Sequence, residues 1–115
     1  MPTFYASIGN SDDKLSQREW SAFTVQLVAA IRRRGSVHGI WYSSPNSEYQ
    51  NACVCFEVDE GPAVEEITVA LAQLAETYRQ DSIALATAET RFVGAARWLD
   101  GDNGRPVTRG GSGRP

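Results

Sequence analysis

The stretch YQNACVCFEV, residues 49–58, constrains the fold more than any other part of the sequence. Its apolar side chains alternate along the chain, as they do in a β-strand. One side of such a strand is apolar throughout: Ala52, Val54, Phe56 and Val58. The other side carries Cys53 and Cys55, and reduced cysteines behave as small apolar side chains. Because both sides are apolar, we predict an inner strand of a sheet here.

A complete amphipathic helix is predicted over residues 17–34. Ser16 and Glu19 have the S-x-x-E spacing of a capping box, in which each residue satisfies a free amide of the other. Apolar residues then recur at steps of three and four, which places them on one helical face: Trp20, Phe23, Leu27 and Ile31. Three arginines end the helix, and Gly35 after them predicts a left-handed stop.

The remaining elements complete a regular order. Strands are predicted at 3–8 and 36–43, a second helix at 63–79, and a last strand within 81–93, where a turn of helix before the strand stays open. The order is β-α-β-β-α-β. It predicts the α+β class with a ferredoxin-like fold, in which an antiparallel sheet carries both helices on one face. The first and third strands would be inner strands of that sheet, and the second and fourth its edges.

Length and composition predict one folded domain followed by a tail. Residues 1–98 form the predicted domain, and the Gly-, Arg- and Pro-rich residues 99–115 are predicted to be a disordered tail. The net charge of −3 disfavours nucleic acid as a partner. The sequence contains neither a signal-like N-terminus nor an apolar run of membrane-spanning length, so we expect a cytoplasmic protein without membrane contact.

The sequence offers two weak candidates for a metal site. Asn10, Asp12 and Asp13 could be metal ligands in the loop before the first helix. A calcium loop of the EF-hand type, however, needs a glutamate that is missing at the required spacing. Cys53 and Cys55 with His38 would give three zinc ligands and leave the fourth without a candidate. We therefore expect neither a metal nor another cofactor.

Two classes of function stay open. In the first, the chain is a non-catalytic interaction module, because a sheet with helices on only one face leaves Trp41, Cys53 and Cys55 uncovered unless a second copy or another protein covers them. In the second, a small dimeric α+β-barrel-like enzyme or ligand binder uses a cleft over the sheet. Its acid/base pair would be His38, the only histidine, and Tyr42 on the same strand face. The first is our leading hypothesis.

Three stretches carry a resemblance to a known group of proteins. FYASIGNSDDKLSQREW, HGIWYSSPNSEYQNAC and YRQDSIA are similar to small proteins of actinobacteria and their phages that have no established activity. The similarity extends over most of residues 3–93 and implies no catalytic residue. A phage or mobile-element context would imply a host-interaction or anti-defence protein.

Overall fold

The computed structural model of the chain describes residues 2–10, 12–59 and 61–96, and these residues form an α+β fold. The elements are β1 (Thr3–Gly9), α1 (Gln17–Arg32), β2 (Gly35–Tyr42), β3 (Asn51–Val58), α2 (Pro62–Thr77) and β4 (Ala84–Ala88). The four strands form one sheet in the order β2-β3-β1-β4, and every neighbouring pair is antiparallel. The predicted class, the antiparallel sheet and the inner position of the first and third strands are confirmed.

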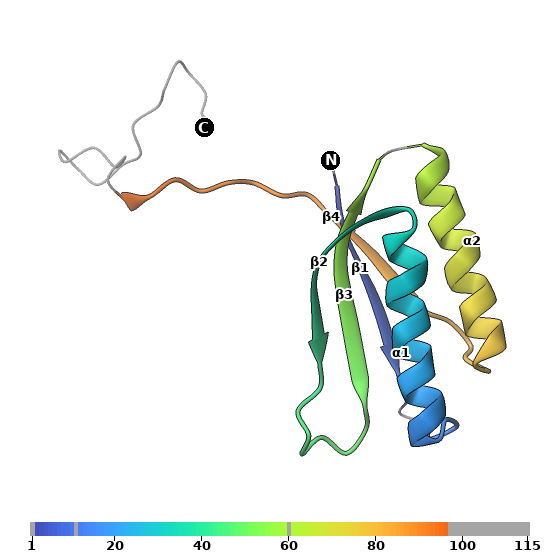
Figure 1. Cartoon of the computed structure of the whole chain (residues 1–115). Coiled ribbons are helices and arrows are strands. Elements are labelled where there is room, and N and C mark those ends of the chain that lie inside the picture. The colour runs from blue at the N-terminus through green and yellow to red at the C-terminus, as the bar shows by residue number, and fades with distance from the viewer. Residues whose placement is uncertain (1, 11, 60, 97–115) are drawn as a thin grey trace.

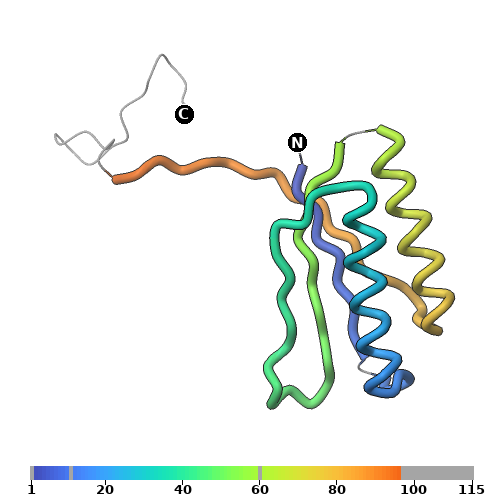
Figure 2. The backbone as a smooth tube through the Cα atoms, in the orientation of Figure 1, coloured from blue at the N-terminus to red at the C-terminus, as the bar shows by residue number. Residues whose placement is uncertain are grey.

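Both helices lie on the same side of the sheet (Figures 1 and 2). Alternate residues of β1 and β3 face them and are buried in a single core, as the period of two predicts. Aromatic rings fill its centre: Phe4 stacks on Phe56 with 5.5 Å between ring centroids, and Phe23 of α1 stacks on Tyr78 just after α2 at 4.7 Å. The core therefore occupies the space between the helices and one face of the sheet.

The start of α1 has the geometry that the sequence pattern indicates. The Ser16 hydroxyl accepts a hydrogen bond from the Glu19 amide at 3.1 Å, and the Glu19 carboxylate accepts one from the Ser16 amide at 3.0 Å. Leu15 before the cap and Trp20 after it are both buried. These contacts fix where the helix begins and turn its apolar face towards the sheet.

The predicted role of Gly35 is wrong. The helix ends at Arg32 with a right-handed cap at Arg33, and Gly35 is the first residue of β2 rather than a left-handed stop. A Cβ atom at Gly35 would lie 2.4 Å from the carbonyl oxygen of Glu57 on β3. Glycine is needed here because the two strands approach closely. The sequence pattern at the end of a helix does not reveal such an approach between distant segments.

The last strand is shorter than predicted. β4 covers only Ala84–Ala88, and its pairing with β1 ends at the pair Thr3–Ala88, because β1 itself begins at Thr3 after a proline that has no amide hydrogen to donate. Residues 89–96 then leave the sheet and extend away from the body of the domain (Figure 1). No turn of helix precedes β4 in the described residues 80–83.

The predicted domain boundary and tail fall outside the described residues, and the expectation about the membrane is tested only in part. The domain boundary after Trp98 and the disordered tail at 99–115 both lie beyond the described chain. No helix in the described part is long and apolar enough to cross a membrane.

Candidate interaction surface

The side of the sheet that faces away from the helices carries mostly small side chains, and we call it the open face. Strand register places its residues in three rows across the sheet. The first row is Gly39, Cys55, Tyr5 and Ala86, and the second is Trp41, Cys53, Ser7 and Ala84. The third row, Ser36, Glu57, Thr3 and Ala88, is mostly polar. Among the described residues, no helix or loop residue of the hydrophobic core covers this side of the sheet. The sequence expectation that Trp41, Cys53 and Cys55 share an uncovered face agrees with this register.

Trp41 is the largest side chain on the open face. Its indole ring lies along its own strand above Gly39, where an added Cβ atom would lie 2.8 Å from the ring. The ring is 56% exposed, and Tyr5 on β1 is 37% exposed. Cys55, between Gly39 and Tyr5 in the register, is buried. The open face therefore presents two aromatic side chains on a floor of small residues.

The two cysteines are both free, as their alternate-residue spacing predicts. The Ser7 hydroxyl donates a hydrogen bond to the sulfur of Cys53 at 3.5 Å. The thiol of Cys55 raises the pKa of the Tyr5 hydroxyl, first through a side-chain hydrogen bond and then through charge repulsion. These contacts link β1 to β3 across the open face.

The structure does not bring His38 and Tyr42 together. A β-bulge between Val37 and Gly39 inserts one extra residue, so the alternation of side chains changes along β2. The imidazole Nε2 of His38 lies 3.5 Å from a carboxylate oxygen of Glu57. Tyr42 lies opposite Ala52, a core-facing residue, and lines a hollow between α1 and β2. An acid/base pair of His38 and Tyr42 in one cleft therefore has no geometric support.

The polar loop before α1 has a structural role. The side-chain amide of Asn10 donates to the Leu15 carbonyl and accepts from the Leu15 amide, both at 3.0 Å. Asn10 is almost fully buried, and its backbone amide donates to the backbone carbonyl of Gln50 at 2.9 Å. Asn10 therefore holds the loop closed. Within the described residues no three His, Cys, Asp or Glu side chains gather as metal ligands.

Sequence reasoning missed two features of this part of the molecule. Alanines at alternate positions of β4, Ala84 and Ala86 with Ala88, lie opposite open-face residues of β1, and their period of two was a signal that the open face continues to the sheet edge. Arg79 was also missed. Its guanidinium donates to the Lys14 carbonyl and to Glu19, both at 3.0 Å, so it joins the end of α2 to the start of α1.

Comparison with known proteins finds no matching family model, no similar curated protein and no similar solved structure. The open face and its surroundings are therefore interpreted from their own chemistry.

Proposed function

We propose that this protein is a non-catalytic interaction module that associates with a second copy of itself through the open face of the sheet. The observation that carries the proposal is the composition of that face. Cysteine, serine, alanine and glycine side chains form its floor, and Trp41 and Tyr5 stand exposed on it. Exposed apolar patches mark sites of contact, so contact with protein is the expected use of this face.

The ferredoxin-like arrangement is part of the same proposal. Support comes from the element order β-α-β-β-α-β, from the strand order β2-β3-β1-β4 and from the placement of both helices on one side of the sheet. Sheets pack face to face at a spacing of about 10 Å when small and large side chains interdigitate. The open face offers small residues and two aromatic side chains for that packing.

A role in host interaction or anti-defence extends this proposal and rests on the resemblance of three stretches to proteins of actinobacteria and their phages. The enzyme or ligand-binding alternative receives less support, because His38 and Tyr42 belong to different faces of β2. The interaction module remains the better explanation of the surface.

Replacing Cys53 with aspartate tests the proposal. The substitution puts a carboxylate at the centre of the open face, and burial of an unpaired carboxylate in an interface is costly. Cys53 is only partly buried in the monomer, so the fold should survive. We expect Cys53→Asp to lower the sedimentation mass at tens of micromolar while the circular dichroism spectrum stays unchanged.

Val25→Asp is the matched control, since Val25 is 64% exposed on α1, away from the open face. It should leave the mass unchanged. An unchanged mass for Cys53→Asp would overturn the proposal. So would a small molecule that copurifies with the wild-type protein and is lost in His38→Ala, because that result would favour the ligand binder.

A further inference from the structure

A second surface lies at the β4 edge of the sheet. We propose that this edge, together with the groove between β4 and α2, binds residues 89–96 of a second copy, and that the exchange is reciprocal. We call residues 89–96 the arm. This inference goes beyond the proposed function, because it concerns a different surface and different residues.

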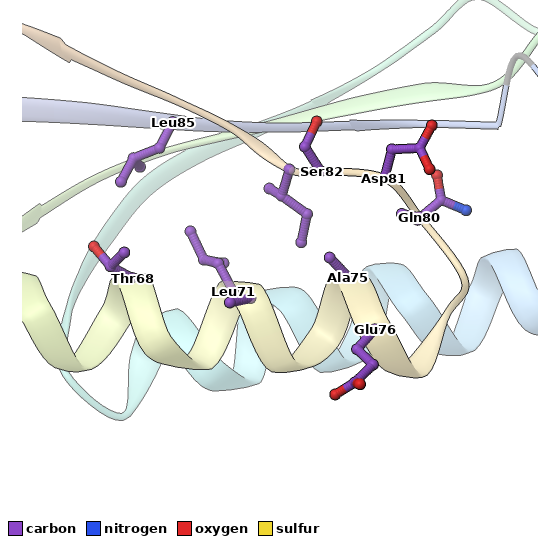
Figure 3. Close-up of a pocket in the computed structure, with 10 residues that line it drawn as sticks. Thr68, Leu71, Ala75, Glu76, Gln80, Asp81, Ser82 and Leu85 are labelled. Carbon is purple, nitrogen blue, oxygen red and sulfur yellow. The ribbon is translucent and has the colours of Figure 1, made fainter.

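The groove is apolar inside and open to the edge of the sheet. It has a volume of about 640 Å³. Leu71 and Ala75 of α2 point across it towards β4 and the segment before β4 (Figure 3). Ile83 also lines it, and both Ile83 and Leu85 are only half-buried. The domain's own described residues leave this apolar space unfilled.

The strand beside the groove has a free edge. β4 pairs with β1 on one side, and among the described residues no strand pairs with its other side. Such an edge presents unpaired amide and carbonyl groups to any extended segment that lies along it. A segment bound there would gain backbone hydrogen bonds from β4 and apolar contacts from the groove.

The arm is an extended segment whose large apolar side chains are not covered by any other described residue. Phe92 is 86% exposed and Val93 is 83% exposed, which are the highest values among the large apolar side chains that the structure describes. The arm begins directly after β4 and leaves the body of the domain (Figure 2). It is therefore placed to reach a neighbouring copy.

A two-fold axis perpendicular to the sheet brings the two surfaces together. Such an axis sets β4 antiparallel to β4 of the second copy, so each arm continues along the partner's β4 and the residues before it. Directly opposed residues of an antiparallel pair lie on the same side of the sheet. Ile83 and Leu85 line the groove. Side chains alternate along a strand, and Val93 lies an even number of residues from both, so an unbroken strand turns Val93 into the groove.

Two variants test the exchange from opposite sides, both in the Cys53→Asp background so that only the arm contact remains. Val93→Asp places a carboxylate on the arm where the groove is apolar, and Ala72→Arg fills the groove from an exposed position on α2. We expect the Cys53→Asp chain to be a dimer and each added variant to weaken its association by at least about tenfold. Val25→Asp in the same background should leave the dimer intact.

Mixing the two variants gives a sharper readout. Each variant alone forms homodimers in which both arm contacts are damaged, whereas a mixed dimer pairs one normal arm with one normal groove. We expect the mixture to associate more tightly than either variant. Any one of three results would overturn the inference. The Cys53→Asp chain could be a monomer, Ala72→Arg could weaken association while Val93→Asp does not, or the mixture could associate no more tightly than each variant alone. An unchanged mass on adding Cys53→Asp to the wild type would instead count against the open face alone.

Discussion

Gly35 shows how a single residue sets the distance between two strands. It follows the arginines that end α1, yet its backbone is not left-handed. The nearest atoms to an added Cβ would be the Glu57 carbonyl oxygen at 2.4 Å and the Val58 Cγ1 atom at 2.5 Å. The hydrogen at this position is therefore what lets β2 begin directly beside the end of β3.

Gly35→Ala should destabilise the protein by about 1–3 kcal/mol, because the obstructing carbonyl is part of the backbone and cannot rotate away. Urea unfolding would measure the change. Gly39→Ala is the matched control, since its nearest obstruction is the Trp41 ring at 2.8 Å, an exposed side chain that can move. Equal losses at both glycines would contradict this explanation.

At the scale of elements, the start of α1 and the end of α2 are joined by a small polar cluster. Glu19 accepts from the Ser16 amide and from the Arg79 guanidinium, both at 3.0 Å. The Lys14 ammonium donates to the Arg79 carbonyl at 3.3 Å. Arg79 adopts a left-handed backbone with φ of 59°, which turns the chain out of α2. The cluster therefore couples the capping of one helix to the ending of the other.

This coupling has a pH signature. The hydrogen bond from the Ser16 amide, and then the one from Arg79, lower the pKa of Glu19 below its ordinary value of 4.5. A group with a lowered pKa in the folded state stabilises the fold when it is ionised, so its contribution is present at neutral pH and is lost as the pH falls below about 4.5.

Glu19→Gln should therefore lower stability at neutral pH, and its difference from the wild type should shrink below about pH 4.5. Urea unfolding across a pH series would measure this. Glu48→Gln, in the exposed turn between β2 and β3, is the control and should follow the wild type at every pH. A Glu19→Gln difference that stays constant down to acidic pH would show that Glu19 acts without its charge.

At the scale of the whole molecule, the two proposed contacts use surfaces that do not overlap. The open face lies on the side of the sheet away from the helices, and the groove lies on the helix side at the β4 edge. Each contact is isologous, with the same patch on both copies. Two isologous contacts close into a tetramer when their two-fold axes cross at right angles.

We therefore expect the wild-type chain to sediment as a tetramer at tens of micromolar. Cys53→Asp alone and Val93→Asp alone should each give a dimer, and the double variant should be a folded monomer. Sedimentation equilibrium of the four chains measures this directly. A wild-type monomer would exclude both contacts. A wild-type dimer that one single variant converts to a monomer would exclude the contact that this variant leaves intact.

Periodicity was sufficient to predict the order and type of the elements, because the pleat of a strand and the turn of a helix fix which residues share a face. It did not fix the length of β4. The capping residues Ser16 and Glu19 were predictable for the same reason, since the cap is a contact between residues three apart. The bulge that separates His38 from Tyr42 was not, because a strand's bulge depends on how it pairs with its neighbour. The close approach at Gly35 and the exposed groove beside β4 likewise arise only when distant segments meet.

The bulge in β2 has a consequence for growth of the sheet. An assembly that joins strands edge to edge can add copies without end when both edges accept a new strand, and the result is a fibre. Here one edge, β4, is regular and beside a groove, whereas the other, β2, is interrupted between Val37 and Gly39. An interrupted edge is a poor template for a further strand. In the proposed arrangement, we expect sideways addition to stop once two β4 edges have met, because the two edges of the sheet are unlike.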